Sequence, residues 1–188
     1  PWYSEDEPIL WWSPDPRFVM YPKDIKVSKS MKQVFKKKEF TITIDQDFEG
    51  VVKKCQKMYR PGQYGTWITD DMLAAYCTLH QAGFAHSVET WDDDHNLVGG
   101  LYGMAIGKCF FGESMFAEVS NASKAAYVRL VQQLALWGFS LIDCQVYTKH
   151  LESLGAVKIS RYLFLNQLEN ALQQPFKPGK WHFDEETP

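Results

Sequence analysis

Two polar side chains stand out in an otherwise apolar segment, residues 141–146, where Asp143 and Gln145 lie two positions apart. In a β-strand, residues two apart point to the same face, so this carboxylate and amide would leave a core element together. A carboxylate is costly to bury unless it is paired or used. Two interpretations stay open: an Asp bonded to a nearby backbone N–H, and a reactive pair that orients or deprotonates a substrate.

Glu113 is a second unusual residue, because it lies between aromatic residues and a methionine in the segment 111–116. It fits a solvent-exposed hairpin end and a ligand pocket about equally well. A third feature is a basic run with lysines at Lys29, Lys32, Lys36, Lys37 and Lys38. Such a run is usually a solvated helix face, and it gains a function only if the protein binds a polyanion.

Several other chemistries lack their expected spacing. Gly99, Gly100, Gly103 and Gly107 lie within a predicted strand, which favours close backbone packing over a phosphate-binding loop. The five histidines show no metal-ligand pattern, so we expect neither a metal nor another cofactor. The four cysteines are dispersed, which is typical of reduced thiols in a cytosolic protein.

The composition is that of a globular domain. The chain has 188 residues, of which 45% are hydrophobic and 23% charged, with a formal net charge of −3. Nucleic-acid binding would therefore need a local basic patch rather than a global field. No apolar run reaches the roughly 18 to 20 residues that cross a bilayer. The acidic opening segment also lacks a secretory pattern.

Alternating and helical periodicities predict the elements that would position these residues. Strands are expected at 9–12, 17–20, 40–44, 86–91, from 97 onward, 108–111 and 141–146. Helices are expected from Ser28 or Ser30, from Asp47, from Thr69, from Asn121 or Ser123, and near 162–172, followed by a loose C-terminal tail. Strands mixed with helices, with hairpins among the strands, indicate a mixed α/β sheet.

Read in order, several short motifs resemble the bacterial leucyl/phenylalanyl-tRNA–protein transferase family. The most specific strings are Leu-Trp-Trp-Ser-Pro-Asp-Pro-Arg at 10–17 and Leu-Ile-Asp-Cys-Gln-Val at 141–146. Further matches are Pro-Trp-Tyr-Ser at 1–4, Ser-Met-Lys at 30–32, and the segments 65–69, 85–89, 97–103, 111–116, 121–124 and 153–156. The resemblance extends from the first residue to about Gly155.

The resemblance implies an enzyme that moves Leu or Phe, and less well Met, from aminoacyl-tRNA to proteins with an N-terminal Arg or Lys. That transfer marks the acceptor for degradation by the N-degron pathway. The implied fold is a GNAT-like α/β domain over residues 17–188, preceded at 1–16 by the remnant of a small N-terminal domain. We expect a cytoplasmic monomer that does not bind membranes.

The resemblance also implies roles for particular residues. Asp143, Gln145 and Glu113 would be catalytic, with Glu113 contacting an amine or the basic side chain of the acceptor. The donor side chain would fill an apolar pocket formed by Leu101, Phe110, Met115, Leu130, Leu134 and Ile142. Trp2 and Trp67 would stack on the terminal adenosine. The lysines of the basic run would contact tRNA phosphates.

Two alternatives stay open. A small-molecule N-acyltransferase could use a CoA thioester on a similar fold, although the Gly-rich strand-to-helix loop of such enzymes is missing. A non-catalytic RNA-binding module would bind aminoacyl-tRNA and be indifferent to replacement of Asp143.

Overall fold

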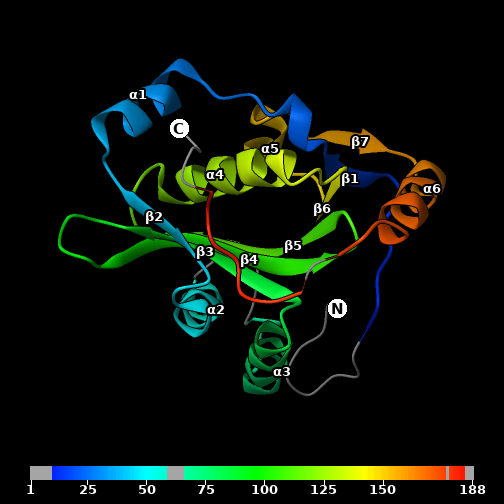
Figure 1. Cartoon of the computed structure of the whole chain (residues 1–188), viewed down its shortest axis with the longest axis horizontal. Helices are drawn as coiled ribbons and strands as arrows, with labels where there is room; N and C mark the ends of the chain where they lie inside the picture. Colours follow the sequence, from blue (N-terminus) through cyan, green and yellow to red (C-terminus); the bar gives the residue numbers. More distant parts are fainter. Residues whose placement is uncertain (1–9, 59–65, 177, 185–188) are drawn as a thin grey trace.

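The structure is a computed structural model that describes residues 10–58, 66–176 and 178–184. Its centre is a seven-stranded mixed sheet with strand order β2-β3-β4-β5-β6-β1-β7. Helices cover both faces of this sheet (Figure 1). The mixed α/β class expected from the sequence is therefore confirmed.

The strands are β1 (Arg17–Met20), β2 (Thr41–Ile44), β3 (Ala85–Trp91), β4 (Leu97–Ile106), β5 (Cys109–Ala117), β6 (Leu141–Gln145) and β7 (Val157–Ile159). The strand expected at 9–12 is wrong for residues 10–12, where Trp11 and Trp12 are exposed and outside any ladder; Ile9 lies outside the described residues. Strand β7 was not predicted, because three largely exposed residues leave no alternating apolar pattern.

The helices are α1 (Lys29–Lys37), α2 (Phe48–Lys57), α3 (Asp70–Gln81), α4 (Ala122–Leu136), α5 (Lys149–Ser153) and α6 (Arg161–Leu172), with a 3-10 turn at Pro22–Asp24. The predicted starts of α1, α2 and α3 are confirmed. The side chains of Ser28, Asp47 and Thr69 each accept a backbone N–H from the first turn of their helix.

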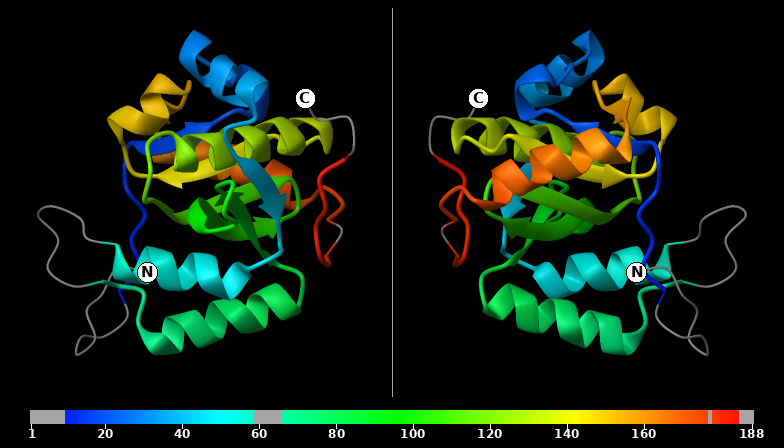
Figure 2. Two further views of the ribbon diagram at one scale, coloured as in Figure 1. Left: turned by 90° about the vertical axis from the view of Figure 1, so that its left-hand side faces the viewer. Right: turned by 90° about the vertical axis from the view of Figure 1, so that its right-hand side faces the viewer.

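Alternate residues of the central strands face two different apolar layers. Ile142 belongs to the cluster beneath α4 and α1, whereas its neighbour Leu141 packs with Phe164 of α6. Tyr102 of β4 packs with residues of α2 and α3 on that second side. Helices α1 and α4 therefore cover one face, and the turned views show α2 and α3 on the other (Figure 2). The packing of Phe164 against Leu141 places α6 on the same side as α2 and α3.

The start of α4 lies unusually close to β4. A Cβ atom added to Gly99 would stand 2.5 Å from Cβ of Ala122, so only glycine permits this approach. The hydroxyl of Thr90 donates to the carbonyl of Ala122 at 3.0 Å. The prediction that the glycines of this strand serve close packing is confirmed at Gly99.

The sheet opens between its two central parallel strands. Strand β5 pairs with β6 only from Cys109↔Leu141 to Phe111↔Asp143. Beyond that point β5 continues beside β4 as far as Gly99↔Ala117, while β6 ends at Gln145. Among the strands of the described residues, none pairs with this edge of β5 from Gly112 onward, and we call this place the β5–β6 opening.

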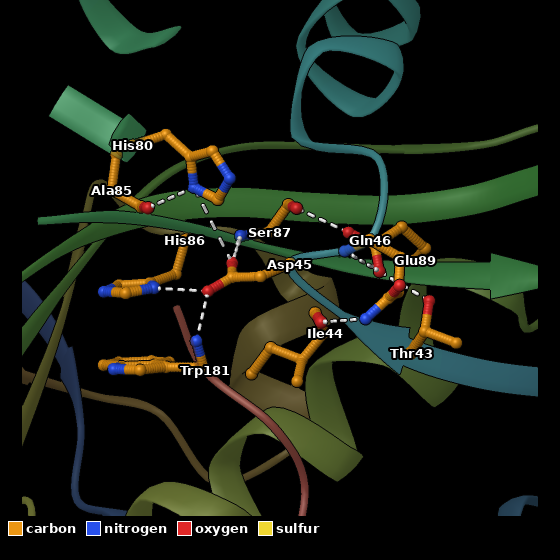
Figure 3. A network of polar contacts seen from close by, with 10 residues as sticks. All are labelled: Thr43, Ile44, Asp45, Gln46, His80, Ala85, His86, Ser87, Glu89 and Trp181. Carbon is orange, nitrogen blue, oxygen red and sulfur yellow. Dashed lines mark hydrogen bonds and ion pairs between the residues drawn. The ribbon is translucent and has the colours of Figure 1, made fainter. Parts of the chain in front are cut away.

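The C-terminal segment, expected to be loose, packs against the domain in its described part. Trp181 is buried, stacks on His86 at a ring distance of 3.5 Å, and donates its backbone N–H to Asp45 Oδ2 at 2.8 Å (Figure 3). Asp184 accepts hydrogen bonds from the side chains of Gln133 and Trp137 on α4 and its C-cap. These contacts are invisible to local periodicity because they join segments far apart in the chain.

Asp45 is the polar centre of that attachment. Its carboxylate also accepts the backbone N–H of Ser87 at 2.9 Å and lies 2.8 Å from Nδ1 of His86 (Figure 3). Beside it, burial raises the pKa of the Glu89 carboxyl above its ordinary value, against hydrogen bonds from Ser87 and Thr43 that lower it. Through these contacts, the carboxylate of Asp45 links the end of β2 to β3 and to the C-terminal segment.

We expect Asp45→Asn to lower the free energy of unfolding by about 3 kcal/mol, because the amide leaves buried donors without an acceptor. Asparagine tolerates the left-handed backbone at this position, where φ is 56°. Urea unfolding measures the loss. The matched control is Asp47→Asn, in which asparagine caps α2 as well as aspartate does. Equal stability of the two variants would contradict a central role for Asp45.

Candidate active site

Asp143 is a fully paired, buried carboxylate at the end of the parallel ladder. It is 1% exposed. Arg17, the first residue of β1, reaches it with both arms of the guanidinium, Nε to Oδ1 at 2.9 Å and Nη2 to Oδ2 at 2.6 Å. Oδ1 also accepts the backbone N–H of Gln145 at 2.9 Å. Both carboxylate oxygens are thus occupied within the protein.

Gln145 lies at the β5–β6 opening in an uncommon backbone conformation. Its φ is 63°, in the left-handed region. Its side-chain Nε2 donates to the carbonyl of Gly112 at 2.9 Å and lies 3.4 Å from Oε2 of Glu113. The side-chain amide therefore takes the hydrogen-bonding role that a β6 backbone group would have filled had the ladder continued.

Glu113 stands on β5 directly beyond the ladder. Burial raises the pKa of its carboxyl above the ordinary value of 4.5, although hydrogen bonds from Gln145 and Tyr76 lower it. Tyr76 comes from α3 and is itself buried. Among the described residues, no lysine, arginine or histidine forms an ion pair with Glu113, whereas Asp143 is paired with Arg17.

The structure brings the three predicted catalytic residues together. Gln145 contacts Asp143 through its backbone and Glu113 through its side chain. The structural interpretation of Asp143, a carboxylate bonded to a nearby backbone N–H, is met by that same bond to Gln145. The two interpretations are therefore not exclusive, since the bond that satisfies Asp143 also fixes Gln145.

The six residues expected to form the donor pocket also lie together. They form part of one apolar cluster between α4 and the sheet, in which Met115 is partly buried and the other five are buried: Leu101, Phe110, Leu130, Leu134 and Ile142. They line the α4 face of the sheet. Arg17 packs over the Phe164 ring of α6, at 4.9 Å from the centroid, so the Arg17–Asp143 pair lies on the opposite face.

The other predicted contacts are only partly placed. Trp67 is half-buried and meets Tyr76 edge to face, with the ring centroids 6.5 Å apart. Because Tyr76 also donates a hydrogen bond to Glu113, Trp67 is linked to Glu113 through this one side chain. Trp2 lies outside the described residues. The lysines of the basic run are all exposed on α1 and its C-cap: Lys29, Lys32, Lys36, Lys37 and Lys38.

Two residues of the site were not predicted. Arg17 falls within a predicted strand and within one of the family motifs, and Tyr76 falls within the helix predicted from Thr69. A buried aspartate calls for a cation, and an arginine opening the buried strand at 17–20 was a usable signal. No local sequence pattern relates Tyr76 to Glu113, because α3 and β5 are separate in the chain and come together only in the folded structure.

The arrangement of potential metal ligands and the surroundings of the Cys144 thiol complete the description of the site. Within residues 10–58, 66–176 and 178–184, no group of three or more His, Cys, Asp or Glu is arranged to hold a metal ion. Burial raises the pKa of the Cys144 thiol to about 12, so the thiol is protonated at neutral pH.

Of the helices in the described segments, none has both the length and the apolar character for a membrane span.

A search of solved structures finds a weak likeness. "The structure of L-PGS from Bacillus licheniformis" superposes with a TM-score of 0.48 and 9% identity, covering 72% of this chain and 46% of that chain.

Sequence comparison gives much closer relatives. The leucyl/phenylalanyl-tRNA protein transferase of Syntrophus aciditrophicus is 52% identical over all of this chain and 78% of its own length. The proteins of the same name from Hydrogenovibrio crunogenus and Nitrosospira multiformis are 52% and 51% identical, over 96% and 99% of this chain and 70% and 79% of their own lengths. The family description "Leucyl/phenylalanyl-tRNA protein transferase" matches residues 19–169. The chain belongs to the leucyl/phenylalanyl-tRNA–protein transferase family.

Proposed function

We propose that this protein transfers Leu or Phe, and less well Met, from aminoacyl-tRNA to the α-amino group of proteins that begin with Arg or Lys. In this proposal the product is a substrate of the N-degron degradation pathway. Family membership supports the donor and the reaction class. The observation that carries the proposal is the side-chain amide of Gln145, held at the β5–β6 opening between the carboxylate of Asp143, which pairs with Arg17, and the carboxylate of Glu113.

The reaction needs little base strength. The donor carries an activated ester, and the attacking α-amine has a pKa near 8, so about a tenth of it is neutral at pH 7. The amine nitrogen forms a bond to the ester carbonyl carbon, and the bond from that carbon to the ribose oxygen breaks. The nitrogen loses one proton and the ribose oxygen gains one. Orientation and electrostatics then supply most of the rate.

The arrangement divides the work between Asp143 and Gln145. Because Arg17 and the Gln145 N–H occupy both oxygens of Asp143, this carboxylate orients Gln145 rather than accepting the proton of the amine. Gln145 holds the ester carbonyl or the amine at the opening. Its amide is fixed in advance by Gly112, which is how polar groups act without reorganisation cost.

Glu113 is suited to the acceptor. Its carboxylate has no bound cation among the described residues, and burial strengthens its attraction for a positive charge. An N-terminal Arg or Lys offers two positive groups, the side chain and the protonated α-amine. Contact with Glu113 would therefore select a basic acceptor and place its amine beside Gln145.

Donor and acceptor would approach from opposite faces of the sheet. The apolar cluster proposed for the donor side chain lies on the α4 face, while Asp143 lies on the face covered by α6. The β5–β6 opening is where the two faces meet. Met115, partly buried and unbranched, is the member of the cluster best suited to move aside for Leu, Phe or Met.

The rest of the donor would be held by stacking and by charge. In the proposal Trp67 and Trp2 stack on the terminal adenosine, and the lysines of α1 contact phosphates of the acceptor stem. We further propose a GNAT-like domain at 17–188 with the remnant of a small N-terminal domain at 1–16, acting as a cytoplasmic monomer.

The direct test is to incubate labelled Leu-tRNA with a protein that starts in Arg and to look for labelled protein. In the same assay, Asp143→Asn should keep donor binding and lower the single-turnover rate by about 10²-fold, because the shape survives and the orienting charge does not. The control acceptor is the same protein starting in Glu, which should gain no label. An unchanged rate in Asp143→Asn would remove Asp143 from the reaction.

Binding of an Arg-starting peptide should depend on the charge of Glu113. Because the pKa of Glu113 is raised, its negative charge appears only as the pH rises above the ordinary value of 4.5. We expect affinity, measured by calorimetry without donor, to increase with pH over that range and then level off. Glu113→Gln should bind about tenfold more weakly at neutral pH and lose this dependence.

The matched control is Glu118→Gln, which removes a nearby carboxylate that pairs with Lys54 outside the site. It should keep the pH dependence of the wild-type protein. A pH dependence that survives in Glu113→Gln would show that another group receives the acceptor.

Charge reversal on α1 separates the two interpretations of the basic run. If Lys29, Lys32 and Lys36 contact phosphates, replacing them with Glu should lower the slope of log affinity for Leu-tRNA against log salt by about one per lost contact. A leucyl-adenosine donor without an acceptor stem should be used normally. Equal losses on both donors would mean that the substitutions damaged the fold, and an unchanged slope would leave the helix as a solvated face.

A further inference from the structure

We propose that Arg17 is a positioning residue of the transfer reaction, which fixes the amide of Gln145 at the β5–β6 opening by holding Asp143 in place. The inference rests on the proposed function for its kinetic consequence. Arg17 is not a catalytic residue in this account, because it reaches the opening only through Asp143.

The first support is the geometry of the pair. Arg17 is anchored in β1, where it is the register partner of Ile159 in β7. Its guanidinium lies over the ring of Phe164 and donates from two nitrogens to the two oxygens of Asp143. The side chains are only 11% and 1% exposed, so water can compensate neither charge fully.

The second support is that one oxygen of Asp143 serves two partners. Oδ1 accepts Nε of Arg17 and the backbone N–H of Gln145, both at 2.9 Å. The bond to Gln145 stabilises a non-glycine residue with φ of 63°, a conformation that side chains disfavour. If the Asp143 side chain shifts, the backbone of Gln145 loses the contact that compensates this strain.

The third support is the path of β1. Its register with β6 shifts between Phe18 and Val19, with Phe18 opposite Gln145 and Val19 opposite Asp143. Arg17 therefore lies just beyond the residue that faces Gln145. The guanidinium of Arg17 thus connects β1 to β6 at this irregular pairing through its hydrogen bonds to Asp143. Lysine could supply the charge here but not the planar pair of donors.

The test compares Arg17→Met, Arg17→Lys and a control that removes another arginine, Arg161→Met. Arg161 lies at the start of α6 and its side chain donates to the carbonyl of Ser13, away from Asp143. Arg17→Met should lower the single-turnover transfer rate by about 10²-fold while affinity for Leu-tRNA stays within about twofold. Arg17→Lys should fall between Arg17→Met and the wild-type protein, and Arg161→Met should match the wild type.

A double variant tells whether Arg17 acts through Asp143. Because the two residues work as one unit, Arg17→Met combined with Asp143→Asn should transfer no more slowly than Asp143→Asn alone. A merely structural role for Arg17 would add its own loss. A double variant that is much slower than Asp143→Asn, or an Arg17→Met variant with the wild-type rate, would overturn the proposal.

A readout without substrate separates this proposal from the proposed function. Hydrogen exchange of the Gln145 backbone amide should be faster in Arg17→Met than in the wild-type protein and unchanged in Arg161→Met. Unchanged exchange in Arg17→Met would overturn the positioning role. If the wild-type protein failed to transfer Leu while the exchange result held, the proposed function would fall and the positioning of Gln145 by Arg17 would stand.

Discussion

The end of the parallel ladder between β5 and β6 is the constraint on which the site depends. The two strands share three register positions, and β6 then turns away at the left-handed Gln145. The carbonyl of Gly112 loses its backbone partner there and receives the side-chain amide of Gln145 instead. A polar side chain is thus fixed where the two strands separate.

Two carboxylates near this opening differ because of their partners. Asp143 is buried against the guanidinium of Arg17, which neutralises it. Glu113 meets only uncharged donors among the described residues, and burial raises its pKa. Asp143 is therefore held by a cation inside the protein, while Glu113 is the carboxylate that we propose for the basic acceptor. Similar residue types acquire different tasks from their surroundings.

The sequence predicted what is encoded locally. Capping residues such as Ser28 and Thr69 mark helix starts within a few positions, and those starts are confirmed. Polar residues inside apolar segments singled out Asp143, Gln145 and Glu113, which the fold brings together.

Contacts between distant segments could not be read in this way. Arg17 meets Asp143 across 126 positions, and Trp181 meets Asp45 across 136. The register of β1 on β6 decides the first contact, and packing of the C-terminal segment decides the second. The placement of the apolar cluster between α4 and the sheet on one face, and of Asp143 on the other, depends likewise on strand order, which local patterns do not contain.

The central claim is that the reacting carbonyl lies in the β5–β6 opening, with the donor side chain on the α4 face and the acceptor amine on the other. A crystal structure with phenylalanyl-adenosine, joined by an amide so that it cannot react, tests this most directly. The account predicts the phenyl ring against Met115 and Leu130 and the carbonyl within hydrogen-bond distance of the Gln145 amide. A phenyl ring on the α3 and α6 face, or a carbonyl remote from Gln145, would contradict it.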